Sequence, residues 1–336
     1  MVLFSISVGR GSVQKTALGL DPLRGCEGDR GDSVGKCRLR VSLTNKLGSG
    51  YPINDPQKGI PVVNTSEKYD RIGTGYNDSR TADPYLVQRL YSLLVEKSSF
   101  LGNGMQPFLD VGCGTGNYTS ALAKKGVSLV GLDPSMKMLS EARLKSEAIS
   151  WVQGKAESMP FGNDSMAGAL ATLTLHHWED LRGGFGELAR VLVDGGRFVV
   201  LTATPEQMRG YWLNHYFPEM LAKSIEQMPG LDEVESGMGS AGFRIIEKEK
   251  YFVRTDLRDL FLYAGKHNPG LYLDERVRKG ISSFADLANA REVEVGLGHL
   301  AADIESGKVL EIIQEYANER GDYLFLVAEN SEKAST

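Results

Sequence analysis

The chain has 336 residues, of which 41% are apolar and 24% charged, so it can bury a substantial core and has the composition of an ordinary globular protein. Its formal net charge of −5 provides no global basic field, which argues against a sequence-independent nucleic-acid binder. Three cysteines, Cys26, Cys37 and Cys113, form no disulfide framework or metal-ligand pattern, which favours a reducing compartment. No run approaches the roughly eighteen apolar residues that a membrane span requires, so we expect no stable membrane insertion.

Residues 1–60 show no sustained helical or strand period and are rich in glycine and small polar side chains. Such a composition buries too little apolar surface to order itself, so we predict a disordered or loosely packed N-terminal extension. The start of the chain lacks the basic segment of a secretory signal, and we expect a cytoplasmic protein. Residues 1–20 contain Arg10 and Lys15 but no acidic residue, which leaves an organelle transit peptide as the alternative.

Ordered elements are expected from about residue 63 onward. Pro84 stands at a first helical position after Asp83, and apolar residues recur behind it at helical spacing. Farther along, short apolar runs alternate with helical patterns, which is typical of an α/β sheet. We predict strands over residues 108–111, 127–133, 149–154, 167–173, 197–202, 242–253 and 322–328, and helices over residues 84–97, 119–125, 180–192, 207–228, 256–262, 274–287 and 308–318.

A glycine-rich turn follows the first of these strands, with Gly112, Gly114 and Gly116 at every second position and a helical segment directly behind them. Glycine lacks the Cβ that would keep a ligand away, so strand, glycine turn and helix can hold a nucleotide-like ligand against bare backbone. The spacing G-x-G-x-G is one residue shorter than the dinucleotide fingerprint. Asp110 would repel a pyrophosphate but suits a cationic ligand. An ordinary turn with incidental glycines is the alternative.

The second strand ends in Asp133, which stands 21 positions after Gly112. A carboxylate at this point of an α/β nucleotide fold binds ribose hydroxyls through a charge-assisted bidentate hydrogen bond. The alternative is a helix N-cap for the segment that begins at Pro134. Both roles can coexist, since the carboxylate has two oxygens.

Several motifs resemble those of one known family. The run Asp110-Val-Gly-Cys-Gly-Thr-Gly116 resembles motif I of the class I S-adenosylmethionine (SAM) methyltransferases. Residues 154–161 resemble the family's Gly-x-Ala-Glu-x-x-Pro-Phe run, and residues 192–200 resemble its turn into the fifth strand. The resemblance covers roughly residues 65–255 and the last strand, and it is nearest to the methyltransferase type 11 group, which includes quinone-biosynthesis enzymes. It implies a Rossmann-like α/β fold with a seven-stranded, mostly parallel sheet and an antiparallel last strand.

The same resemblance implies SAM as the cofactor. It implies that the glycine turn cradles the amino-acid end of SAM, that Asp110 helps to hold its ammonium group, and that Ala156 and Glu157 lie along the adenine edge. Tyr76 and Arg80 would touch the SAM carboxylate or close the pocket, with a packed surface loop as an equal alternative. The residues assigned to cofactor binding are Asp110, Gly112, Cys113, Gly114, Gly116, Asp133, Pro134, Met136, Ala156, Glu157, Tyr76, Arg80 and Leu173, of which Met136 has core packing as its alternative.

Two adjacent histidines, His176 and His177, follow the fourth strand and should border the site, because ligands of such sheets lie outside the carboxyl ends of the strands. Imidazole can act as a general base near neutral pH. We favour cofactor-lining or packing over that role. We expect adjacent histidines on a turn to point apart, and no carboxylate or cysteine cluster completes a metal site.

About 65 residues separate the last two predicted strands, far more than a hairpin needs. We therefore predict a core over residues 61–254 and 320–330 and a helical lid over residues 255–319 that covers the substrate mouth. The loop over residues 263–273 has the polar and aromatic composition of a binding loop, although packing in a helix connection is the alternative. The candidate substrate contacts are Tyr263, Lys266, His267 and Tyr272.

The predicted function is methyl transfer from SAM to a small-molecule acceptor by in-line displacement, with the acceptor atom undetermined. The alternatives are a non-catalytic SAM-binding protein and, against the charge of Asp110, an NAD(P)-dependent oxidoreductase. Nucleic-acid methylation is disfavoured, because the chain is acidic and no Asn-Pro-Pro-Tyr-like motif follows the fourth strand. We expect a monomer or a homodimer.

Overall fold

The computed structural model describes residues 80–96 and 106–331. The predicted extension over residues 1–60 and the cofactor candidate Tyr76 lie outside these residues. The chain divides into two units, Met1–Gly59 and Ile60–Thr336, and the description that follows concerns the second.

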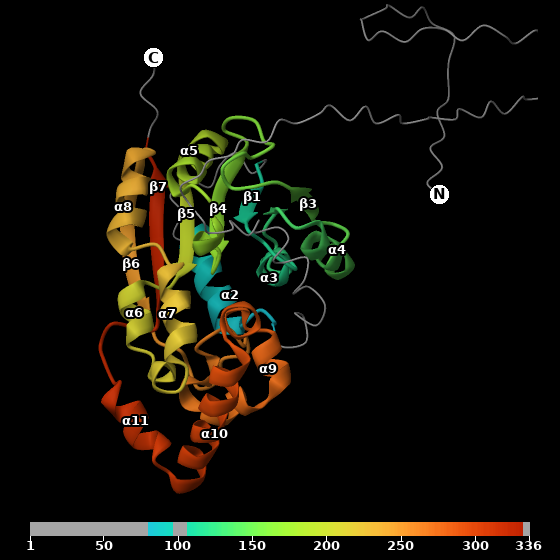
Figure 1. Ribbon diagram of the computed structural model, residues 1–336. Helices are drawn as coiled ribbons and strands as arrows, with labels where there is room; N and C mark the ends of the chain where they lie inside the picture. Colours follow the sequence, from blue (N-terminus) through green and yellow to red (C-terminus); the bar gives the residue numbers. More distant parts are fainter. Residues whose placement is uncertain (1–79, 97–105, 332–336) are drawn as a thin grey trace, which may run out of the picture. The chain divides into compact units, whose positions relative to one another are not determined.

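A seven-stranded sheet forms the centre of this unit, with the strand order β3-β2-β1-β4-β5-β7-β6 (Figure 1). The first five strands pair in parallel, while β7 runs antiparallel to both β5 and β6. The predicted fold class is thereby confirmed. The strands are β1 (Phe108–Val111), β2 (Leu129–Asp133), β3 (Ser150–Gln153), β4 (Met166–Thr172), β5 (Leu192–Thr202), β6 (Phe243–Tyr251) and β7 (Tyr323–Asn330).

Helices and shorter helical turns surround the sheet and connect its strands. The helices are α2 (Pro84–Tyr91), α3 (Asn117–Ala123), α4 (Met136–Lys145), α5 (Leu181–Val191), α6 (Pro205–Arg209), α7 (Pro218–Glu226), α8 (Leu231–Ser240), α9 (Glu275–Lys279), α10 (Ala290–Ser306) and α11 (Val309–Glu315). The shorter turns are η2 (Ser92–Glu96), η3 (Leu175–His177), η4 (Trp212–His215), η5 (Ala264–His267), η6 (Pro269–Leu273) and η7 (Ser283–Leu287).

The sheet has a hydrophobic core on each face, because successive strand residues point to opposite sides. In β5, Phe198 and Val200 join the core that α5 and α8 cover, whereas Val199 and Leu201 join the core on the other face. That second core also contains apolar residues of α2, α3, α7 and the segment between β6 and β7. One face of the sheet therefore packs against ordinary crossover helices, and the other packs against the long C-terminal insertion.

The start of α2 follows its predicted signal. Asp83 Oδ1 accepts hydrogen bonds from the backbone N–H groups of Tyr85 and Leu86 at 2.9 and 3.0 Å, and Pro84 occupies the first turn. Asp83 Oδ2 accepts a third bond from Arg258 N at 2.9 Å, so the same carboxylate also holds the insertion. A single side chain thus satisfies helix-terminal donors and joins two distant segments.

The segments that follow β5 and β6 contain helices, but their elements differ from the predicted ones. Residues 256–262 form an irregular segment rather than a helix, and residues 207–228 divide into α6, η4 and α7. The 17-residue helix α10 was not predicted, because its glycines have low intrinsic helix propensity. Gly296 permits close packing, since a Cβ there would lie 2.4 Å from Tyr216 O. Figure 1 shows α9, α10 and α11 together beyond one end of the strands.

Asp322 holds the two ends of the insertion together. Its Oδ2 accepts hydrogen bonds from Val253 N and Lys266 Nζ, both at 2.6 Å, and its own N–H donates to Tyr251 O at 2.8 Å. Asp322 is buried, so the Lys266 ammonium compensates a carboxylate that is removed from water.

In the part of the chain that the structure describes, no helix has the length and apolar character needed to cross a membrane.

Candidate functional site

Two adjoining cavities lie at the carboxyl ends of the parallel strands, with volumes of about 190 and 40 Å³. They share Gly112, Pro134, Thr174 and His177 in their walls, so they form two compartments of one site. This is the edge at which an open α/β sheet binds its ligands. Most predicted cofactor residues meet here. Asp110, Gly112, Cys113, Gly114, Asp133, Pro134, Arg80 and Leu173 line the larger cavity, Ala156 and Glu157 line the smaller one, and Gly116 and Met136 line neither.

The three glycines of the turn have different tasks. All three have positive φ values, 71° at Gly112, 53° at Gly114 and 71° at Gly116. A Cβ at Gly112 would lie 2.1 Å from Thr174 Oγ1, and one at Gly116 would lie 2.4 Å from the ring of Trp151. No atom lies within 4 Å of the corresponding position at Gly114. The outer glycines therefore permit close packing, whereas Gly114 presents open backbone to the cavity.

Asp133 fixes this turn against the end of the neighbouring strand. Its Oδ2 accepts a hydrogen bond from Gly114 N at 2.8 Å, and its Oδ1 accepts one from Ser135 N at 2.9 Å. The N-cap of α4 is Ser135, whose Oγ accepts from Met138 N at 3.2 Å. The alternative of Asp133 as this cap is therefore wrong. Each carboxylate oxygen has more than one acceptor direction, so these two bonds are compatible with a ligand contact.

Asp110 lies in the cavity wall close to the glycine turn and is 2% exposed. The pKa of its carboxyl is raised to about 7, chiefly by burial and in smaller part by the nearby charge of Asp133, while the hydrogen bond from Thr119 opposes this shift. Thr119 Oγ1 donates to Asp110 Oδ2 at 2.6 Å. Burial and the same two carboxylates raise the pKa of the Cys113 thiol, which disfavours a thiolate at this position. A bound cation would offset the desolvation of Asp110.

The smaller cavity holds the residues that were assigned to adenine. Ala156 is buried in its wall, and Glu157 lines it beside Trp178 and Glu179. Glu157 Oε1 accepts hydrogen bonds from the N–H groups of Glu179 and Asp180 at 2.7 and 3.2 Å, which positions the chain before α5. Outside both cavities, Met136 is 47% exposed. Another methionine of α4, Met138, lines the larger cavity instead.

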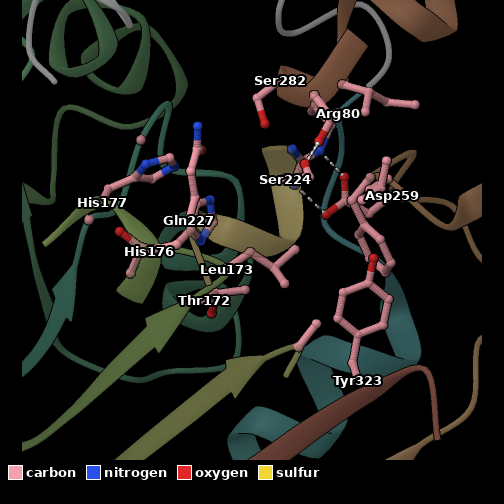
Figure 2. Close-up of a pocket in the computed structure, with 18 of the residues that line it drawn as sticks. Arg80, Thr172, Leu173, His176, His177, Ser224, Gln227, Asp259, Ser282 and Tyr323 are labelled. Carbon is pink, nitrogen blue, oxygen red and sulfur yellow. Dashed lines mark hydrogen bonds and ion pairs between the residues drawn. The ribbon is translucent and has the colours of Figure 1, made fainter. Parts of the chain in front are cut away.

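Arg80 enters the wall of the larger cavity as part of a buried network. Its Nε and Nη2 donate to Asp259 Oδ1 and Oδ2 at 2.5 and 3.1 Å, and Asp259 Oδ2 also accepts from the Tyr118 hydroxyl at 3.0 Å. The Asp259 side chain is 1% exposed. Asp259 belongs to the insertion and was missed in the sequence, where it is a lone acid without a motif. The network joins the cofactor end of the site to the insertion (Figure 2).

The two histidines line the larger cavity, but they do not point apart as expected. Their ring centroids lie 3.8 Å from one another with the ring planes at 50°.

Leu173 directly follows β4 with a φ value of 55°, a left-handed conformation that is unfavourable for a residue with a Cβ. Among residues 80–96 and 106–331, no group of three His, Cys, Asp or Glu side chains could hold a metal ion.

The far wall of the larger cavity comes from the insertion and from α7, but not from the predicted binding loop. Tyr263 stacks on Tyr211 with centroids 3.8 Å apart, Lys266 pairs with Asp322, and His267 Nε2 lies 2.7 Å from Val253 O. Tyr272 is fully buried, with its hydroxyl donating to Leu262 O at 2.8 Å. The alternative of packing therefore describes all four candidates. The wall is formed by Met208, Tyr211, Ser224, Gln227, Met228, Asp259, Phe261, Leu262, Ile281, Ser282, Ser283, Leu287 and Tyr323.

The two cavities lie at the sheet edge where open α/β folds bind their ligands, and comparisons with known proteins identify the family. The profile of the methyltransferase domain family matches residues 109–200. A demethylmenaquinone methyltransferase of Chlorobaculum tepidum is 32% identical over 168 residues, which are 44% of this chain and 68% of that protein. The chain therefore belongs to the SAM-dependent methyltransferase family, type 11 group.

Two further proteins are similar to most of this chain. The bifunctional biotin biosynthesis protein BioHC of Cellvibrio japonicus is 30% identical over 272 residues, which are 73% of this chain, and the chain spans about half of that relative, 52%. A crystal structure from Anabaena variabilis, described as a methyltransferase from an antibiotic biosynthesis pathway, is 33% identical with a TM-score of 0.64. That match covers 74% of this chain and 98% of the other.

The open backbone of Gly114 yields a first prediction. Gly114→Ala should weaken SAM binding at least tenfold, because the added methyl group occupies the bare surface of the turn. Because the alanine must adopt the positive φ of Gly114, the substitution should also cost roughly 1–2 kcal/mol of stability. Gly126→Ala is the control, since Gly126 has a φ value of 89°, open space around it and no place in either cavity. Calorimetric titration with SAM and thermal unfolding measure both effects. Equal SAM affinities in the two variants would contradict the role of Gly114.

The raised pKa of Asp110 yields a pH dependence. Ionised Asp110 favours a cationic ligand, so SAM affinity should rise about tenfold from pH 6 to pH 8 beyond any change in Asp110→Asn. The comparison with this variant removes the titration of SAM itself. The pKa of Asp110 in the fold lies above its unfolded value, so its contribution to stability falls as pH rises from about 4 to 7. The variant should therefore unfold at a higher temperature than the parent at pH 8. Parallel pH profiles for SAM binding would exclude this role.

The network around Asp259 yields a third prediction. Asp259→Ala leaves Arg80 without its bidentate partner and should destabilise the fold by about 3 kcal/mol. Tyr118→Phe removes one hydrogen bond and should cost about 1 kcal/mol. Asp256→Ala is the control, because Asp256 pairs with Arg254 in solvent and such pairs contribute little. Urea unfolding of the three variants measures how much unfolding free energy each substitution removes. A cost for Asp256→Ala equal to that for Asp259→Ala would refute it.

Proposed function

We propose that this chain transfers the methyl group of SAM to a small-molecule acceptor. The observation that carries the proposal is the open Gly114 backbone between Asp110 and Asp133, in a cavity that continues to a wall of different composition. An exposed glycine backbone and two carboxylates fit a ligand with a cationic amino acid at one end and ribose hydroxyls farther along. The smaller cavity, with Ala156 in its wall, fits the flat base.

The residues of the site would bind SAM and align the acceptor with its methyl group. Gly114 and Asp110 would hold the amino-acid end, Asp133 the ribose, and Ala156 and Glu157 the base. When bound, SAM supplies an electrophilic methyl group on a good leaving group. The chain then needs chiefly to align the acceptor with that methyl group and to exclude water. His176 and His177 line the cavity at the place where an acceptor proton could be taken up, although the reaction needs a base only for acceptors that lose a proton.

The acceptor would lie against the wall that α7, η7 and residues 259–262 form. This wall replaces the loop over residues 263–273 as the proposed substrate surface, because the side chains of that loop are engaged in packing and in hydrogen bonds with the protein itself. The size of the larger cavity, about 190 Å³, supports a small-molecule acceptor rather than a macromolecular one.

We also propose that the protein is cytoplasmic, that it acts as a monomer or homodimer, and that it does not bind nucleic acid. The acidic net charge supports the last point, since nucleic-acid binding sites present basic surface.

The test is incubation of the full chain with methyl-labelled SAM and a deproteinised metabolite extract. We expect label in a small organic product, and calorimetry should detect binding of SAM but not of NAD. The Gly114→Ala variant is the control, because its damage lies in the cofactor cradle. SAM binding without label transfer would favour a non-catalytic SAM-binding protein, and binding of NAD in its place would refute the proposal.

A further inference from the structure

The wall on the acceptor side of the larger cavity carries no uncompensated formal charge within the described residues. Asp110 and Asp133 lie at the cofactor end, beside the glycine turn. Where the cofactor end meets the insertion, the guanidinium of Arg80 and the carboxylate of Asp259 compensate one another in a bidentate ion pair. A charged acceptor would be transferred from water to a site that offers it no counter-charge, and burying such an ion costs several kcal/mol. This end of the cavity therefore favours an uncharged molecule.

Most polar groups of this wall already have partners within the protein. The hydroxyls of Ser224 and Ser283 bond to one another at 2.5 Å. The Tyr211 hydroxyl donates to Asp322 O at 2.5 Å, and the Tyr323 hydroxyl accepts from Tyr263 N at 3.3 Å. The rest of the wall includes Met208, Met228, Phe261, Leu262, Ile281 and Leu287, which offer apolar contact. An acceptor would thus meet a mostly apolar surface.

Thr172 is different. Its Oγ1 is buried, lines the larger cavity and has no hydrogen-bond partner in the described part of the chain. A buried hydroxyl that stays unsatisfied carries a penalty of about 1–3 kcal/mol, so a partner from outside the protein is expected. Thr172 lines the larger cavity, so a molecule bound there is the source of that partner that we consider.

The strand geometry explains where this hydroxyl points. Leu170 of β4 belongs to the core on the face that the insertion covers, and Ala169 and Ala171 belong to the opposite core. Side chains alternate along a strand, so Thr172 faces the insertion, as Leu170 does. Two residues later, Thr174 lies against Gly112 of the cofactor turn. Thr172 therefore stands at the boundary between the cofactor end and the acceptor wall, and Figure 2 shows it beside Leu173 among the residues that line the cavity.

We propose that Thr172 is a specificity-determining residue. Its hydroxyl hydrogen-bonds the single polar group of an uncharged, largely apolar acceptor and so orients that molecule toward the cofactor end. This inference rests on the proposed methyltransferase function, because it assigns the occupant of the second half of the same cavity. The left-handed backbone at Leu173 turns the chain directly after Thr172, which separates the acceptor contact from the cofactor contact at Thr174.

The test uses phenol and toluene as probes of equal shape that differ by one hydroxyl group. The protein carries ¹³C-methyl methionine and is saturated with S-adenosylhomocysteine, and the methyl signals of Met208 and Met228 report occupancy of the acceptor wall. We expect Thr172→Val to weaken phenol binding about fivefold to tenfold and to leave toluene binding unchanged. Thr172→Ser, which retains the hydroxyl, should restore phenol binding. Benzoate should bind the parent more weakly than phenol.

Ser120 provides the matched control. Its Oγ is also buried without a partner in the described residues, but Ser120 lines neither cavity, so Ser120→Ala should leave phenol binding unchanged. Equal phenol binding by the parent and Thr172→Val would overturn the proposal, and so would equal weakening of phenol and toluene, which indicates lost packing. Absence of binding of both probes to the parent, or tighter binding of benzoate than of phenol, would overturn it as well. Failure to bind S-adenosylhomocysteine would instead refute the proposed function.

Discussion

The hydrogen bond between the Asp133 carboxylate and Gly114 N is the interaction on which the rest of the site depends. It joins the end of β2 to the turn after β1, and the second oxygen of the same carboxylate holds Ser135 at the start of α4. A glycine with a positive φ value has no side chain to fix its position, so this external bond holds its peptide in place. The carboxylate that we propose to bind the ribose therefore also fixes the glycine turn of the cavity wall.

The acceptor side has an independent scaffold. Asp322 holds the two ends of the insertion together, and Asp259 and Asp83 join it to the helices and loops of the core. These carboxylates are buried and satisfied by several donors each, which makes them expensive to disturb. The cavity lies between two separately supported walls. Changes in the apolar side chains of the insertion can thus alter the acceptor without affecting the glycine turn.

The parts of the site that could be predicted from the sequence are those whose signal is local. Asp110 lies within an apolar strand that the glycine turn follows, Asp133 ends the next strand, and the fold places them together because parallel strands end at one edge. Asp259 could not be found in this way, since it acts through a partner 179 positions away. The sequence could not decide between packing and binding for Tyr263, because an aromatic residue in a polar loop has the same composition in both cases.

An unsatisfied hydroxyl does not by itself identify a binding residue. Ser120 and Thr172 both have buried oxygens without partners among the described residues, yet Ser120 lines neither of the two cavities. The difference lies in the surroundings. Thr172 lines a cavity in which Ser224, Ser283 and Tyr211 form hydrogen bonds within the protein, so a molecule in that cavity gains by offering it a hydrogen bond. The proposed selectivity rests on this hydrogen bond rather than on a charged group.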